Sequence, residues 1–273
     1  MIQSLAISDN AKSTSPYPLK GDLLQCIDHA KRIGYDGVEL HLGDAKYYDW
    51  HEVADYAARM DMKITSISTG SAYSLDGHYM TNPDAEARRT AQQVLIDFLE
   101  VGKILGGASV GFGIMKGPMP KGGRAAQYTE ILFESLKPVV EAAEKVGTDI
   151  VVEAINRFQS DYLCTAEDTL DFVNRFQSDR VKIHLDTFHI NIEDKDMEQA
   201  IRLCKDKLGY FHFSDSDRCY PGHGHVDYKM VVDTLYDIGY AQEGVGGHEY
   251  NSIPDGVTAA VKGLEHIKQF IRK

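Results

Sequence analysis

The sequence predicts a (β/α)₈ barrel formed by one domain over residues 1–273. Predicted strands and helices alternate along the whole chain and make eight strand–helix units. The length of 273 residues is close to the ~250 residues usual for this fold. Several predicted strands are apolar runs between turn residues, as expected for parallel strands buried on both faces. A doubly wound open sheet is the main alternative, but no GxGxxG follows the first strand and eight units are many for that fold.

The first four units follow a regular order. Strands are predicted at 2–8, 37–42, 63–69 and 108–113, with helices at 19–33, 49–60, 83–105 and 124–146. The third helix has a start signal in Asn82-Pro83-Asp84 and a stop signal in Gly106-Gly107.

The last four units continue the alternation. Strands are predicted at 149–155, 180–186, 209–215 and 243–250, with helices at 165–176, 196–208, 228–238 and 254–271. Thr165 stands in capping-box spacing to Asp168, which predicts the start of the helix at 165–176.

Composition limits the partners and the compartment. The formal net charge of −12 disfavours nucleic-acid binding, which depends on neutralising phosphates. No apolar run is long enough to span a membrane, and the first residues do not resemble a signal peptide. The four cysteines form no CxxC pair, which favours a reducing compartment. We therefore expect a cytoplasmic protein without a nucleic-acid or membrane partner.

Four potential metal ligands close the last four predicted strands in sequence order: Glu153, Asp186, His212 and Glu249. Each has a simpler explanation by itself: a salt-bridged Glu153, a turn-capping Asp186, a core His212 or a rim Glu249. Together they favour a site, because parallel barrels keep their chemistry at the carboxyl ends of the strands. Three carboxylates and one imidazole suit Mn²⁺, Mg²⁺ or Co²⁺ better than a thiolate-binding metal.

The segments "EAINRF", "LDTFHINIED", "GYFHFSDSDR" and "PGHGHVDY" resemble the ketose 3-epimerases that act on D-tagatose and D-allulose (psicose). These enzymes belong to the xylose-isomerase-like barrel superfamily of sugar isomerases and epimerases. The barrel resemblance covers the whole chain, and the specific one covers roughly residues 151–227.

The resemblance implies a metal site and a substrate site. It implies that the four ligands hold one divalent ion, Mn²⁺ first, and that His189 and Arg218 bind a small-molecule sugar. Epimerisation at C3 needs a proton removed beside a carbonyl and one returned to the opposite face. Glu153 and Glu249, from different strands, would exchange these protons. The resemblance also implies a homo-oligomer, either a dimer or a tetramer.

Two departures from the 3-epimerases concern the substrate. Gln159 stands where these enzymes usually have Glu, and the eighth strand, "GVGGHEYNS", replaces an apolar strand that ends in "EPF". We expect Gln159 to contact the substrate as a neutral amide. The alternatives are an aldose–ketose isomerase or a keto-sugar lyase with the same enediolate chemistry, and a non-catalytic sugar-binding subunit. A three-zinc endonuclease is disfavoured because the third and fourth strands end without histidine.

Overall fold

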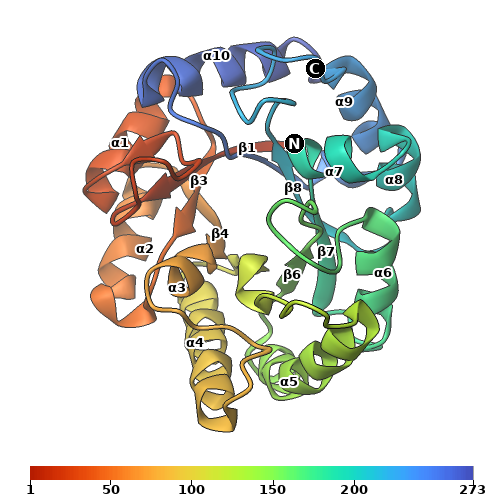
Figure 1. Cartoon of the computed structure of the whole chain (residues 1–273). Helices are drawn as coiled ribbons and strands as arrows, with labels where there is room; N and C mark the ends of the chain where they lie inside the picture. Colours follow the sequence, from red (N-terminus) through yellow and green to blue (C-terminus); the bar gives the residue numbers. More distant parts are fainter. Residues whose placement is uncertain (273) are drawn as a thin grey trace.

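Eight parallel strands close into a barrel, as predicted. The computed structural model describes residues 1–272. The strands follow one another around the barrel in sequence order, and β1 pairs with β9 to close it, with Leu5 opposite His248. Figure 1 shows the strands in the middle and the helices around them. The barrel strands are β1 (Ile2–Ser8), β3 (Gly37–His41), β4 (Lys63–Ser68), β5 (Ser109–Phe112), β6 (Ile150–Glu153), β7 (Val181–Asp186), β8 (Leu208–Phe213) and β9 (Val245–His248).

The outer helices begin at polar caps. Seven of the side chains at helix starts accept a backbone N–H, as N-caps do: Asp22, Asp49, Asp84, Thr165, Asp196, Asp227 and Asp255. Thr165 Oγ1 accepts the Asp168 N–H at 3.1 Å, which confirms the predicted start. The outer helices are α1 (Leu23–Ile33), α2 (Trp50–Arg59), α4 (Ala85–Ile104), α5 (Ala125–Val146), α6 (Ala166–Asn174), α8 (Met197–Leu203), α9 (Tyr228–Asp237) and α10 (Gly256–Lys268).

The helix predicted at 19–33 is four residues shorter at its start. Leu19–Lys20 form a two-residue strand, β2, beside β1, and Gly21 has φ 131° before the Asp22 cap. The positive φ interrupts a helix, so α1 begins only at Leu23. The helix predicted at 196–208 also ends early, at Leu203.

Two short helices were not predicted, and both follow a strand directly. They are α3 (Gly70–Ser74) after β4 and α7 (Thr187–Glu193) after β7. Three 3₁₀ turns, η1 (Ala45–Tyr47), η2 (Ile114–Lys116) and η3 (Tyr240–Gln242), complete the elements described in residues 1–272. Asp186 is both the last residue of β7 and the N-cap of α7.

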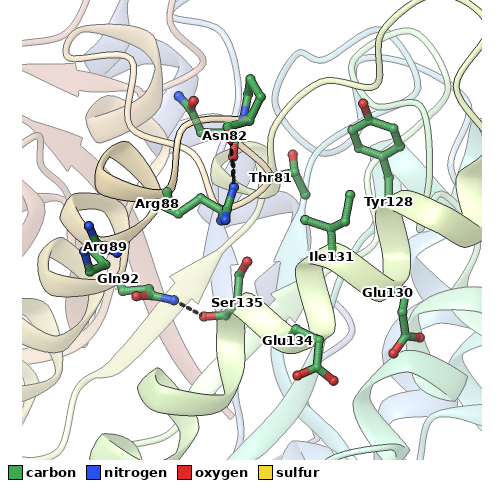
Figure 2. A pocket seen from close by; sticks show the side chains of 12 residues that line it. Thr81, Asn82, Arg88, Arg89, Gln92, Tyr128, Glu130, Ile131, Glu134 and Ser135 are labelled. Atoms are coloured by element: carbon green, nitrogen blue, oxygen red, sulfur yellow. Dashed lines mark hydrogen bonds between the residues drawn. The ribbon is translucent and has the colours of Figure 1, made fainter.

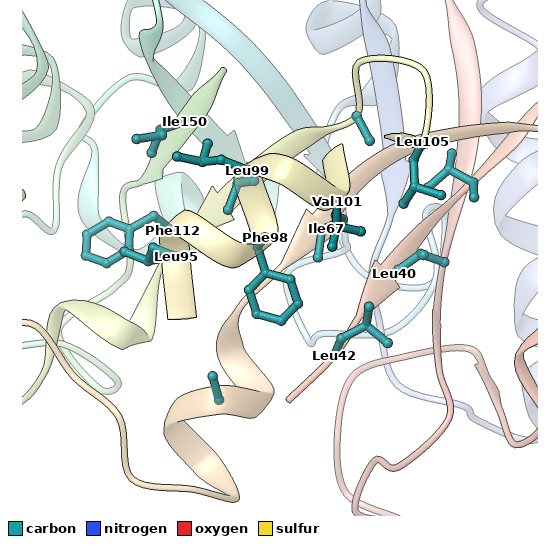
Figure 3. Close-up of a cluster of buried hydrophobic side chains, with 14 of the residues drawn as sticks. Leu40, Leu42, Ile67, Leu95, Phe98, Leu99, Val101, Leu105, Phe112 and Ile150 are labelled. Atoms are coloured by element: carbon teal, nitrogen blue, oxygen red, sulfur yellow. The ribbon is translucent and has the colours of Figure 1, made fainter. Parts of the chain in front are cut away.

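The apolar core lies between the strands and the outer helices. Figure 3 shows part of it, where Leu95, Phe98 and Leu99 of α4 lie among strand residues such as Ile67 and Phe112. Fully burying one such side chain contributes about 1.5–3 kcal/mol.

Polar side chains fill part of the barrel interior below the mouth. Ser4 and Thr65 hydroxyls lie 2.7 Å apart, and Thr65 Oγ1 lies 2.8 Å from the Tyr210 hydroxyl. Successive strand residues point to opposite faces, so Val38 and Leu40 join the apolar core whereas Glu39 faces the interior. The core thus fixes the strands, and the interior side chains form a floor for the mouth.

Candidate metal site at the mouth of the barrel

The structure brings the four predicted ligands together at one end of the barrel. Glu153 and Asp186 are the last residues of β6 and β7, His212 lies near the end of β8, and Glu249 follows β9. Ligand atoms of Asp186, His212 and Glu249 all lie within 4.8 Å of one another. Glu153 meets the same limit with Asp186 and His189, and separately with His184 and His212.

The imidazole of His212 is oriented by Glu39, a residue for which we predicted no role. Glu39 Oε2 accepts the Nε2–H of His212 at 2.6 Å, and Oε1 accepts the Ser68 hydroxyl at 2.7 Å. The other ring nitrogen, Nδ1, lies 3.6 Å from Glu249 Oε2 and 3.8 Å from Asp186 Oδ2. Among the described residues this buried Nδ1 has no hydrogen-bond partner. A carboxylate behind the far nitrogen is the usual support of a metal-binding histidine.

Electrostatics hold Glu39 ionised. Burial raises the pKa of this carboxyl, but the charges and hydrogen bonds of His212 and His41 lower it by more. The resulting pKa is well below the ordinary value. Burial lowers the pKa of His212, but Glu39, Glu249 and Asp186 raise it more, to about 10 without a bound cation. Glu39 is therefore a hydrogen-bond acceptor, and the carboxylates around His212 favour the binding of positive charge.

Arg218 supplies one positive charge to these carboxylates. Its guanidinium donates to Asp186 Oδ2 and Glu249 Oε2, and it stacks 4.9 Å from the Phe188 ring. The backbone at Arg218, in the loop after β8, is left-handed, with φ 62°, a conformation that non-glycine residues seldom adopt. The arginine was predicted to bind the substrate, and the structure places it directly against two of the predicted metal ligands.

Glycines leave the space that two of the ligands occupy. A Cβ at Gly113 would lie 2.4 Å from Glu153 Oε2, and a Cβ at Gly247 would lie 2.6 Å from His212 Cδ2. Real Cβ atoms almost never approach so closely, so a side chain at either glycine would displace the ligand from its present position. The unusual glycine pair in the eighth predicted strand therefore has a steric reason at Gly247.

The carboxyl of Glu153 holds its proton more strongly than an ordinary glutamate does. Burial, followed by the charge of Glu249, raises the pKa of Glu153 to about 8. Its Oε1 lies 3.6 Å from Nε2 of His189. Without a bound cation, the carboxyl of Glu153 is therefore mostly protonated at neutral pH.

The predicted substrate residues border one cavity. His189 Nδ1 accepts the Asn156 side-chain N–H at 2.7 Å, which leaves Nε2 as the nitrogen that faces Glu153. Burial, then the charge of Arg218, lowers the pKa of His189 well below its ordinary value, so its ring is neutral. A cavity of about 120 Å³ is lined by all three predicted substrate residues and by both glutamates: Gln159, His189, Arg218, Glu153 and Glu249.

The donor set fits a divalent cation. Three carboxylates and an imidazole nitrogen without a partner converge in one buried place, and oxygen-rich sets with one nitrogen suit Mn²⁺, Mg²⁺ and Co²⁺.

A larger groove, about 640 Å³, lies between α4 and α5 and shares no lining residue with the cavity at the mouth. In Figure 2 its side chains come from α4, α5 and the segment just before α4, with Gln92 hydrogen-bonded to the Ser135 carbonyl.

A model of the xylose isomerase-like TIM barrel family matches residues 27–270. The chain belongs to this family. It is 30% identical over 231 residues to an L-ribulose 3-epimerase of Mesorhizobium japonicum, covering 82% of this chain and 74% of that one. It is 28% identical over 235 residues to a D-psicose 3-epimerase of Ruminiclostridium cellulolyticum, covering 81% and 76%.

Solved structures of the family agree with the fold. The crystal structure of a D-psicose 3-epimerase from Clostridium cellulolyticum with D-tagatose superposes with a TM-score of 0.79 at 25% identity, covering 100% of this chain and 93% of that one. The curated relatives also include a 3-dehydro-D-guloside 4-epimerase of Escherichia coli, 24% identical over 78% of this chain and 82% of that one. By family, the protein is a sugar epimerase or isomerase.

Three interior residues near the ligands had no role predicted from the sequence: Glu39, His41 and His184. His41 Nε2 lies 3.3 Å from Glu39 Oε1 and 3.6 Å from Glu249 Oε1, so it connects the two carboxylates. The His184 ring packs edge-on against His212, with centroids 4.2 Å apart. The available signal was the alternation in "GVELHL", which places Glu39 and His41 on one face of a strand.

The loop histidines after β8 lie apart from this cluster. His223 Nδ1 pairs with Asp217 Oδ2 at 2.6 Å, and His225 Nδ1 lies 2.9 Å from the Ser216 hydroxyl, both at exposed positions.

No helix described in residues 1–272 is long and apolar enough to cross a membrane.

Proposed function

We propose that the protein is a divalent-metal-dependent epimerase that inverts C3 of a ketose. The observation that supports this most is the partnerless Nδ1 of buried His212, which faces Asp186 and Glu249 beside a cavity at the barrel mouth. The 3-epimerases among its relatives favour this reaction over others of the family.

Glu153, Asp186, His212 and Glu249 would hold the cation, with Mn²⁺ as the first candidate and Mg²⁺ or Co²⁺ as the others. A bound divalent cation would supply Lewis-acid polarisation of the ketose carbonyl and the adjacent hydroxyl. Arg218 contacts two of these carboxylates in the metal-free site and lines the cavity, so its guanidinium would be available to bind substrate oxygens.

Glu153 and Glu249 would exchange the substrate proton. They come from β6 and from the end of β9, and both line the same cavity. One carboxylate takes the proton from C3, and the other returns a proton to the opposite face. Without a bound cation, burial and the charge of Glu249 raise the pKa of Glu153 to about 8, so its carboxyl can hold a proton at neutral pH.

The remaining polar residues would orient the sugar. The neutral His189 presents an Nε2–H toward the cavity, and Arg218 presents a fixed donor fork. Gln159 is exposed at the rim of the cavity, where its amide can both donate and accept hydrogen bonds.

The expected homo-oligomer remains a prediction, which a measurement of the molecular mass in solution checks.

The deciding experiment removes metal with a chelator and restores Mn²⁺, Mg²⁺ or Co²⁺ separately. Each form is incubated with a panel of ketoses and aldoses, and the products are separated by chromatography. We expect metal-restored conversion of a ketose into its C3 epimer. Conversion of aldoses into ketoses would indicate an isomerase, loss of a leaving group a lyase, and binding without turnover a non-catalytic subunit. Each of these three results would contradict the proposed reaction.

A further inference from the structure

The loop after β8 carries a second group of metal-binding side chains, separate from the four at the mouth. Ligand atoms of Asp217, Cys219 and His223 all lie within 4.8 Å of one another. None of these three described residues lines the cavity that contains Glu153 and Glu249. We infer that the three side chains form a second cation site, which takes Zn²⁺ or a similar thiolate-binding divalent ion.

Asp217 lies between the other two members of the group. Its Oδ2 lies 2.6 Å from Nδ1 of His223, and its Oδ1 accepts the Cys219 N–H at 3.0 Å. A cation held by Oδ2 and the imidazole would take the place of the proton that Oδ2 and Nδ1 share. The side chains of Asp217 and His223 are each 42% exposed, whereas Cys219 is buried. An ion could therefore enter from solvent and keep one position for water, as zinc sites with three protein ligands do.

The donor set differs in chemistry from the oxygen-rich set at the mouth. A thiolate favours Zn²⁺ over Mn²⁺ or Mg²⁺, and imidazole and carboxylate are the other two usual zinc ligands. Burial, followed by the charges of Asp217 and Asp215, raises the pKa of the Cys219 thiol to about 11, so this thiol holds its proton without a cation. Zinc binding would release that proton to solvent, and the same two carboxylates favour the incoming positive charge.

The loop is held in this form without an ion. The carboxylate of Asp215 accepts three backbone N–H groups, at 2.7, 2.8 and 3.2 Å, from Ser216, Gly222 and Val226. These hydrogen bonds fix both ends of the segment that contains the three ligands. Binding an ion there therefore costs little ordering of the chain.

Arg218 lies between two of the three ligands in the sequence. Its guanidinium donates to Asp186 and Glu249 at the mouth, and its backbone carbonyl accepts the Asn251 N–H at 2.8 Å. An ion held by the residues on either side of Arg218 would fix the backbone from which this guanidinium extends. The second site would thus stabilise the position of the arginine for which we propose substrate binding.

Cobalt spectroscopy tests the site without reference to the sugar reaction. Co²⁺ substitutes for Zn²⁺ in such sites, and a thiolate bound to Co²⁺ gives a charge-transfer absorption in the near ultraviolet. Since Glu153, Asp186, His212 and Glu249 contain no sulfur, this absorption reports only the second site. The reduced protein is titrated with Co²⁺ and then with Zn²⁺. We expect the absorption to saturate within about two equivalents, because the mouth can also bind one Co²⁺, and to disappear when Zn²⁺ displaces it.

Two pairs of variants assign the ligands. Cys219→Ser should abolish the absorption, whereas Cys164→Ser, at another free cysteine, should retain it. His223→Ala should weaken Co²⁺ binding at this site by at least about tenfold, because loss of an outer partner alone already costs that much. His225→Ala is its matched control, because this exposed histidine of the same loop pairs with Ser216 instead. It should leave the Co²⁺ affinity within about twofold. Circular dichroism checks that each variant is folded.

The inference goes beyond the proposed function and does not depend on it. Asp186→Asn, which removes a ligand at the mouth, should keep the thiolate absorption. Loss of the absorption in folded Asp186→Asn would show that the thiol acts together with the mouth and would overturn a separate site. No absorption in the wild type, an equal absorption in Cys219→Ser, or an absorption that does not saturate would overturn it as well. Each of these results leaves the epimerase reaction to be decided by the sugar panel.

Discussion

Glu39 and His212 form a buried pair in which the carboxylate Oε2 lies 2.6 Å from Nε2 of the ring. The pair joins β3 to β8 and leaves Nδ1 as the nitrogen that faces Asp186 and Glu249. The hydrogen bond therefore selects the tautomer that a cation requires.

Glu39→Leu should weaken metal binding about 10- to 100-fold, the effect usual for removal of an outer-shell partner. Glu39→Gln should lie in between, because its amide oxygen still accepts from Nε2–H but has no charge. Calorimetric titration with Mn²⁺ measures the affinity, and circular dichroism checks folding. Glu198→Gln, which alters an exposed pair with Arg202, is the matched control. Equal affinities in wild type and folded Glu39→Leu would show that Glu39 does not position His212.

Metal affinity should rise with pH from about 6 to 8. The pKa values of Glu153 and His212 in the metal-free site are about 8 and about 10, so both groups hold protons at pH 7. A metal binds the deprotonated groups, so binding releases protons and becomes easier as pH rises. Titrations at pH 7 in two buffers of different ionisation enthalpy count the released protons. Glu153→Gln should release fewer. Proton uptake, or an affinity that is constant over this pH range, would contradict the assignment.

Solvent deuterium should appear at the inverted carbon. Glu153 and Glu249 face one cavity from different strands, and a carboxylate proton exchanges with water between turnovers. The reaction is run in deuterated water, and the product is analysed by NMR. Glu153→Gln and Glu249→Gln should each lower kcat by at least about 100-fold. Turnover without any deuterium incorporation would indicate hydride transfer and rule out this proton exchange.

Gln159→Glu should change substrate preference while leaving metal affinity intact. Gln159 lines the cavity that Glu153 and Glu249 also line, and its amide is not one of the predicted metal ligands. One altered polar contact changes binding by about 1–3 kcal/mol, or roughly ten- to two-hundredfold. Relative kcat/KM values over the sugar panel measure the shift. Changes below about twofold for every sugar would remove Gln159 from the binding site. The double variant with His248→Met then shows, by additive or non-additive effects, whether the two departures are coupled.

The barrel and its four strand ends were predictable because each signal is local. An apolar run that stops at Glu153 or Asp186 places the acid at the strand end without knowledge of the rest of the chain. The pair of Glu39 with His212 was not predictable, because the two residues are 173 positions apart and meet only across the closed barrel. Glu39 in "GVELHL" looked like part of one more buried strand.

Local conformation explains the other differences. Asp186 is the N-cap of α7, and its side chain accepts the Phe188 N–H at 2.8 Å, so one residue serves as both cap and predicted ligand. The sequence offered capping and metal binding as alternatives, and in the structure Oδ1 caps the helix while Oδ2 faces the site. The position of Arg218 depends on its left-handed backbone, which a non-glycine residue seldom adopts and which no sequence pattern indicated.

The most direct test is the metal content of purified wild type, Asp186→Asn and His212→Ala, measured by inductively coupled plasma mass spectrometry after loading with Mn²⁺ and desalting. We expect about one Mn²⁺ per wild-type chain, and much less than one in each variant, because each loses one donor of a four-residue set. Lys137→Met, at an exposed pair on α5, should retain the wild-type content. One equivalent of Mn²⁺ retained by both folded site variants would contradict a metal site formed by Glu153, Asp186, His212 and Glu249.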